Sequence, residues 1–145
     1  MADPGPLRMV LFRLGPKLWA VPAGAVREVI APERPTRIPG TDQAVAGLVN
    51  LRGTLLTVVD GRLALERDAD TETAPGAILV VERNGRGYGL GIDEVLDLVD
   101  VRPEDLMRVA PPEGTAIRGV QAQGRHGGRT FAVLDIEAVF EPVLD

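Results

Sequence analysis

The sequence contains no cysteine and few aromatic residues: one Trp, one Tyr and three Phe. Without cysteine, disulfides, thiolate metal sites and cysteine nucleophiles are excluded, and a reducing compartment is the expected home. So few aromatic rings argue against the stacking platforms of single-strand nucleic-acid binders. The chain is also acidic, with 16 Lys plus Arg, 21 Asp plus Glu and a net charge of −5. Because this charge repels phosphate backbones, nucleic-acid binding is disfavoured.

Long hydrophobic runs are missing as well. No run approaches the ~18 apolar residues of a spanning helix, and residues 1–6 lack the basic start and apolar stretch of a signal peptide. We therefore expect a cytoplasmic protein with a flexible amino terminus over residues 1–6 and no insertion into a membrane. A chain of 145 residues is long enough to bury an apolar core without disulfides or metals.

Glycine and proline are abundant, with 17 and 12 residues. They alternate with short β-branched runs, a pattern typical of many strands joined by tight turns. We predict strands at about residues 9–14, 18–21, 26–30, 44–49 and 54–59, a helical turn at 22–25, a proline-rich loop at 32–39 and an exposed polar connection at 66–76.

The segments on either side of this polar connection resemble each other. Residues 10–12 match 79–81 at an offset of 69, and residues 55–60 match 130–135 at an offset of 75. Each half therefore holds about five strands, the number that closes a small barrel and hides its edges. The sequence predicts a mainly β fold of two similar five-stranded barrels with short helical turns, at about residues 7–74 and 75–141.

Few residues are candidates for catalysis. The only histidine, His126, lies in a glycine-rich hairpin tip without a partner nucleophile. Asp60 and Asp135 follow equivalent strands; they could serve acid–base chemistry in a hydrolase, but capping of the turns that follow them is the favoured role. Four closely spaced glycines suggest a hairpin and not a phosphate loop: Gly85, Gly87, Gly89 and Gly91. Four acidic residues match no calcium-loop spacing and are expected to be solvated: Asp93, Glu94, Asp97 and Asp100. No catalytic residue, metal site or cofactor is predicted.

Arg52 is of a different kind. It lies on a tight turn, Asn50-Leu51-Arg52-Gly53, where a guanidinium held away from a rigid barrel can make forked contacts with a partner. The alternative is a solvated loop arginine. From composition alone the two readings are equally supported.

Several short motifs occur in a specific order. They are residues 11–14 leading to Val21, Val26-Arg27-Glu28-Val29, Gly47-Leu48-Val49-Asn50-Leu51-Arg52-Gly53, Val58-Val59-Asp60 and Gly89-Leu90-Gly91-Ile92-Asp93-Glu94-Val95. In this order and on this repeat, the chain resembles the CheW-like family over about residues 7–141. These are the coupling proteins that join chemoreceptors to a histidine kinase in chemosensory arrays.

The resemblance implies a non-catalytic adaptor of two intertwined barrels forming a single domain. Its first barrel would dock on the regulatory domain of a CheA-like kinase, and its inter-barrel groove would receive the cytoplasmic helical tip of chemoreceptors. Other CheW-like proteins are further expected partners. Its place would be at receptor arrays beneath the membrane, or on the nucleoid with soluble receptors.

The resemblance also assigns roles to individual positions. It implies kinase binding by Val26, Glu28, Ala77 and Ile78; receptor binding or a conformation-setting role for Gly47, Asn50 and Arg52; and protection of backbone geometry by Gly53 and Gly89. Thr57, Gly61 and Asp42-Gln43 depart from the family pattern in the first barrel. The alternative reading is therefore an accessory CheW-like protein that binds a receptor or another scaffold and not the kinase.

Overall fold

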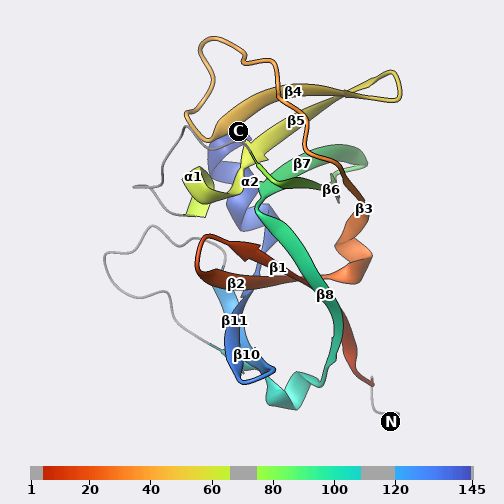
Figure 1. Cartoon of the computed structure of the whole chain (residues 1–145), viewed down its shortest axis with the longest axis vertical. Coiled ribbons are helices and arrows are strands. Elements are labelled where there is room, and N and C mark those ends of the chain that lie inside the picture. Colours follow the sequence, from red (N-terminus) through yellow and green to blue (C-terminus); the bar gives the residue numbers. More distant parts are fainter. Residues whose placement is uncertain (1–4, 66–74, 109–119, 145) are drawn as a thin grey trace.

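The computed structural model describes residues 5–65, 75–108 and 120–144. These residues form two β-sheets, one above the other in Figure 1, with two short helices beside them. The mainly β prediction is confirmed. In chain order the elements are β1 (Leu7–Leu14), β2 (Lys17–Pro22), a 3₁₀ turn (Ala23–Ala25), β3 (Val26–Ile30), β4 (Val45–Leu51), β5 (Thr54–Asp60), α1 (Gly61–Leu65), β6 (Ala77–Arg83), β7 (Arg86–Ile92), β8 (Glu94–Val101), a 3₁₀ turn (Pro103–Asp105), β9 (Met107–Arg108), β10 (Val120–His126), β11 (Arg129–Leu134) and α2 (Ile136–Leu144).

The repeat is intertwined, as predicted. The first sheet has the strand order β8-β1-β2-β11-β10-β9, and the second sheet has the order β3-β6-β7-β5-β4. The first hairpin of each repeat, β1–β2 or β6–β7, pairs with strands of the other repeat. Thus β1 pairs antiparallel with β8 and β2 pairs parallel with β11, while β6 pairs antiparallel with β3 and β7 pairs parallel with β5.

This exchange corrects the predicted division of the chain. The first sheet takes strands from both ends of the sequence, and the second sheet takes those in the middle. A boundary near residue 75 therefore separates the two repeats but not the two sheets. The sequence patterns did not show this, because strand pairing between repeats leaves no trace in local sequence. The first sheet also has a sixth strand, the two-residue β9, beyond the five expected.

The second sheet closes on itself through the loop that follows β3. Thr36 and Leu48 of β4 exchange two backbone hydrogen bonds of 2.8 Å, so the chain leaving one edge strand pairs with the other edge strand. The loop predicted at residues 32–39 therefore contributes to the barrel. Closure of this kind hides edge groups that would otherwise invite pairing with another chain.

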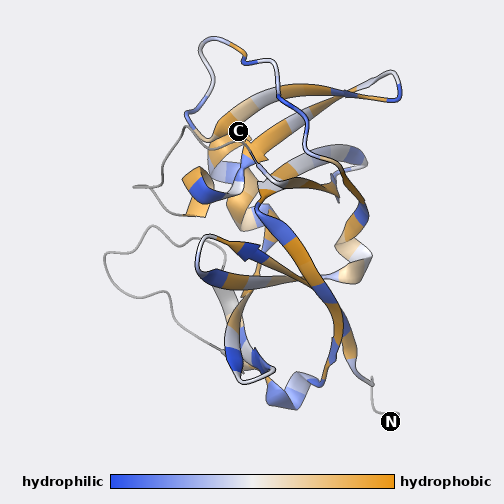
Figure 2. Ribbon diagram, viewed as in Figure 1, coloured by the Kyte–Doolittle hydropathy of each residue, from blue (hydrophilic) through white to orange (hydrophobic). Residues whose placement is uncertain are grey.

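The described residues contain three apolar cores. One lies within each barrel, and the largest, the inter-sheet core, joins the sheets and α2 through residues that include Phe12, Trp19, Leu79, Leu90 and Phe140. Because β1 and β6 are covered on both faces, each has a run of four buried residues in place of the usual alternation. Figure 2 shows the strands as largely hydrophobic and the tip of the β4–β5 hairpin as hydrophilic.

Candidate partner-binding site

The predicted kinase-binding residues lie on two neighbouring strands of the second sheet. Val26 and Glu28 are on β3, an edge strand, and Ala77 and Ile78 are on β6. The two strands are antiparallel, with Val26 opposite Val81 and Ile30 opposite Ile78. Ala77 and Ile78 therefore lie beside the far end of β3, and the four residues do not gather at one point.

Burial removes Ile78 from this set. Ile78 is 0% exposed in the core of the second barrel, so its side chain is not presented at the surface for a partner to contact. Val26 and Ala77 are half-buried and pack against the inter-sheet core. The apolar side chain that β3 presents to solvent is that of Val29, 46% exposed, which the sequence motif contained but did not single out.

Glu28 and Arg52 form one ion-paired unit. Arg52 donates from Nη2 to both carboxylate oxygens of Glu28, at 2.8 and 2.9 Å, and this hydrogen bonding raises the pKa of Arg52. The family resemblance implied kinase binding for Glu28, and receptor binding or a conformation-setting role for Arg52. The structure joins them, although 24 positions separate them in the chain.

The backbone of the β4–β5 hairpin holds Arg52 in place. Arg52 and Gly53 have φ angles of 49° and 86°, the left-handed pair that a two-residue hairpin turn requires. Asn50 accepts a hydrogen bond of 2.9 Å from the Gly53 amide. β4 continues to Leu51, so the predicted turn is shorter than expected.

The two other predicted glycines have different surroundings. Gly47 is buried in β4 beside Thr36, with a φ of 141°. Gly89 is buried in β7, where an added Cβ would lie 2.8 Å from Ile78 and 3.0 Å from Val58. Neither glycine is placed to contact a partner directly.

A recess of about 260 Å³ adjoins the Glu28–Arg52 pair. Leu56 and Val80 supply apolar lining, and Arg27, Glu28 and Arg52 supply charge. Arg27 is itself paired with Glu82 at 3.1 Å. The recess therefore offers an apolar surface bordered by compensated charges, which suits a partner side chain better than a reacting substrate.

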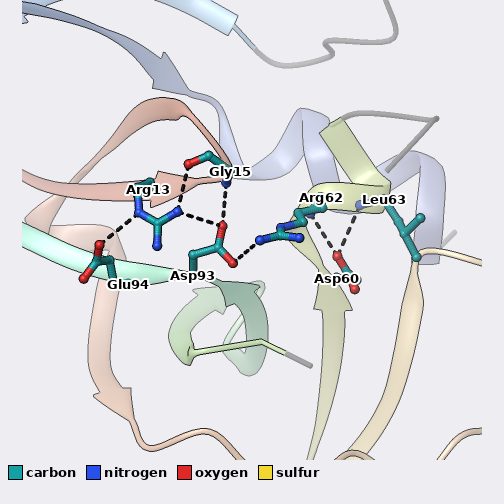
Figure 3. Close-up of polar contacts among 7 residues, drawn as sticks. All are labelled: Arg13, Gly15, Asp60, Arg62, Leu63, Asp93 and Glu94. Carbon is teal, nitrogen blue, oxygen red and sulfur yellow. Dashed lines mark hydrogen bonds and ion pairs between the residues drawn. The ribbon is translucent and has the colours of Figure 1, made fainter. Parts of the chain in front are cut away.

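The structure corrects the expected solvation of Asp93. Its side chain is only 11% exposed and lies in a cluster with Arg13, Gly15 and Arg62, shown in Figure 3. Burial would raise the pKa of Asp93, but the hydrogen bonds from Arg62 and the Gly15 amide hold it below its usual value. Of the other acidic residues in that run, Glu94, Asp97 and Asp100 are exposed.

Asp60 and Asp135 have the predicted capping role. The Oδ1 atom of Asp60 accepts the amides of Arg62 and Leu63 at 2.9 and 3.2 Å, at the start of α1. Asp135 accepts the amide of Glu137 at 3.1 Å, at the start of α2. The two carboxylates belong to separate helix starts, and their hydrogen bonds are satisfied by backbone.

Asp60→Asn should stabilise the protein at neutral pH. Burial raises the pKa of Asp60 despite the two amide hydrogen bonds, so the stability of the natural chain declines as pH rises through that raised pKa. Asparagine keeps the Oδ1 acceptor without the buried charge. We expect the gain in Tm to be largest near neutral pH and to shrink below the usual carboxyl pKa of about 3.9. Thermal unfolding at several pH values tests this, with Asp135→Asn as the matched control; a pH-independent difference would contradict it.

Among residues 5–65, 75–108 and 120–144, no group of three or more metal-binding side chains could hold an ion. No helix in this part of the chain is long and apolar enough to cross a membrane. His126 faces Asp97 at 3.4 Å on the surface, and neither contacts a nucleophile in the described hydrogen bonds.

Together these features describe an intertwined double β-barrel protein whose candidate site is an ion-paired strand edge beside a recess. The model of the CheW-like domain matches residues 8–143. The chain is 30% identical to the chemotaxis protein CheW of Rhizobium meliloti (strain 1021) over 94% of this chain and 88% of that protein. It is 27% identical to the chemotaxis protein CheW of Bacillus subtilis (strain 168), over 92% and 86%. The chain belongs to the CheW-like family.

A solved structure agrees with this assignment. The crystal structure of the scaffolding protein TtCheW from Thermoanaerobacter tengcongensis matches with a TM-score of 0.82 and 25% sequence identity, covering 94% of this chain and 93% of that one. The intertwined double barrel is therefore the fold of a scaffolding protein.

Proposed function

We propose that this protein is a non-catalytic adaptor that couples chemoreceptors to a CheA-like histidine kinase in cytoplasmic signalling arrays. The observation that carries the proposal is the CheW-like match over residues 8–143, which spans nearly the whole chain. The proposed partners are the regulatory domain of the kinase and the helical tip of a receptor.

The surface around β3 supports this proposal physically. Val29 is exposed on one face of the edge strand β3, and the neighbouring Glu28 lines the recess on the opposite face, so the strand offers an apolar contact on one face and a fixed charge on the other. A contact of this size binds weakly on its own. In an array, the contacts that a protein makes with neighbouring partners raise the effective concentration for each further contact. An adaptor therefore needs rigid and well-oriented faces more than it needs high affinity.

Arg52→Glu should weaken partner binding by roughly tenfold or more, the effect of losing one well-placed interface residue. Two negative charges would then replace the Glu28–Arg52 ion pair, and the β4–β5 turn would no longer be held in position beside β3. Calorimetric titration with the kinase regulatory domain, and separately with a receptor-tip fragment, measures the change. Arg8→Glu is the matched control, because Arg8 and Asp100 form an exposed ion pair in the first sheet.

The double variant Glu28→Arg, Arg52→Glu separates two roles for the pair. Binding that returns shows that the pair orients the edge, and binding that stays lost shows that these side chains touch the partner. If the natural protein binds only the receptor fragment, the accessory reading replaces the kinase-coupling one. If it binds neither, the proposal fails.

A further inference from the structure

Asp93 occupies the point where the chain crosses between the sheets. It is the single residue between β7 of the second sheet and β8 of the first. In the described part of the chain the other crossing is the 3₁₀ turn Ala23–Ala25, whose start has no side-chain cap. The crossing at Asp93 instead has hydrogen bonds to the β1–β2 hairpin of the first sheet and to α1, which follows β5 of the second.

On the first-sheet side, Asp93 is attached to the β1–β2 hairpin. Its amide donates to the Arg13 carbonyl at 3.1 Å, and its Oδ2 accepts the Gly15 amide at 2.5 Å. Arg13 lies 3.6 Å from the same oxygen and also donates to the Gly15 carbonyl and to Glu94. The hairpin end, the carboxylate and the start of β8 therefore form one unit.

On the second-sheet side, the same carboxylate is attached to α1. Its Oδ1 accepts Nη2 of Arg62 at 2.5 Å, and Arg62 stands in the first turn of the helix that Asp60 caps (Figure 3). The backbone before β6 also approaches closely, because a Cβ on Gly76 would lie 2.0 Å from the Asp93 carbonyl oxygen. One side chain thus contacts the β1–β2 hairpin of the first sheet and the helix α1 that follows β5 of the second.

Burial separates this cluster from the ion pairs on the surface. Asp93 is 11% exposed and Arg62 26%, whereas Arg8 and Asp100 are 64% and 53% exposed. Surface pairs contribute little because water screens them, while a buried carboxylate needs its partners in place. The attraction within the apolar inter-sheet core has no preferred direction, so a directional contact at the crossing adds an orientational constraint to the one that side-chain packing supplies.

We propose that Asp93, Arg62 and the Arg13–Gly15 hairpin end form a clasp that sets the orientation of the first sheet relative to the second. The Asp93 clasp acts as a positioning device: it fixes the spacing of surfaces on the two barrels while each barrel keeps its own core.

The absence of cysteine makes a direct distance measurement straightforward. Cysteines introduced at Thr54 of β5 and Thr130 of β11, both exposed, would carry spin labels on the second and the first sheet. The distribution of label distances is then measured by pulsed electron paramagnetic resonance in the full chain. Asp93→Asn keeps an acceptor for the Gly15 amide but removes the charge that both arginines face.

We expect Asp93→Asn to broaden or shift the label distance, and Arg62→Met, which removes the contact of Asp93 with α1 and keeps its contacts with Arg13 and Gly15, to do the same to a smaller extent. Asp100→Asn, which breaks an ion pair within the first sheet, should leave the distribution unchanged. Circular dichroism and the fluorescence of Trp19, the sole tryptophan, located in the inter-sheet core, should show that each variant is folded.

Two results would overturn the proposal. A label distance unchanged from that of Asp100→Asn, even with a lower Tm, would mean that the cluster only adds stability. Failure of both Asp93→Asn and Arg62→Met to fold would also contradict it, because a clasp that only orients the sheets leaves the core of each barrel intact.

Discussion

Replacing Phe140 with alanine should destabilise the protein by about 3–5 kcal/mol, the usual effect of truncating a buried phenylalanine. Phe140 is fully buried in the inter-sheet core and lies against Tyr88, with ring centroids 5.8 Å apart. Since roughly 3 °C of Tm corresponds to 1 kcal/mol in a domain of this size, the expected drop is on the order of 10 °C. Thermal unfolding followed by Trp19 fluorescence measures it.

The size of the effect follows from the position of α2, which packs into the core shared by both sheets. A second contact holds the helix in place: Arg83, 8% exposed, donates from Nε to both oxygens of Glu137 at 3.0 Å. Glu141→Ala, on an exposed position of the same helix, is the matched control and should change Tm little. A loss below about 0.5 kcal/mol for Phe140→Ala, the usual scale of a surface change, would mean that α2 is not part of the shared core.

Local features of the fold were predictable because they depend on neighbouring residues. The strands, the hairpin turns and the caps at Asp60 and Asp135 follow from alternating patterns, from glycine in turns and from short-range hydrogen bonds. The internal repeat was visible for the same reason, since each half contains the same order of local patterns. The CheW-like resemblance then supplied the intertwining that these patterns do not contain.

Contacts between distant segments were not predictable in this way. Glu28 and Arg52 carry opposite charges, but nothing local indicates that β3 and the β4–β5 hairpin meet. Asp93 stands in an acidic run and was expected to be solvated; only the crossing between sheets buries it. For Ile78 a signal existed: the continuous apolar run at the start of β6 is typical of a strand covered on both faces, which argues against an exposed contact.

Two of the departures from the family pattern, Gly61 and Asp42, have local explanations. Gly61 starts α1 where a Cβ would lie 2.6 Å from the Gly91 carbonyl oxygen, so the glycine allows the helix to approach β7. Asp42 accepts the Ala44 amide at 2.9 Å and so holds the entry to β4. Thr57 lies in β5 between β4 and β7. These contacts are structural and leave the choice between the two adaptor readings to the binding measurements.

Gly47→Ala should destabilise the chain by about 2–4 kcal/mol, combining an overpacked site with lost hydrogen bonds. Gly47 adopts a φ of 141°, and a Cβ there would lie 2.2 Å from the Thr36 carbonyl oxygen. That oxygen accepts the Leu48 amide at 2.8 Å, so making room for the methyl group breaks the bridge that closes the second barrel. Thermal unfolding and hydrogen exchange at the Leu48 amide measure the two consequences.

Gly24→Ala is the matched control, because no atom lies within 4 Å of an added Cβ there. A Tm for Gly47→Ala equal to that of Gly24→Ala, with slow exchange retained at Leu48, would contradict the closure argument.

The effect of Gly47→Ala should also reach the candidate site. β4 leads directly into the turn that holds Arg52, so a displaced β4 moves the guanidinium away from Glu28. Partner binding by Gly47→Ala, measured well below its Tm, should therefore weaken even though Gly47 itself is buried.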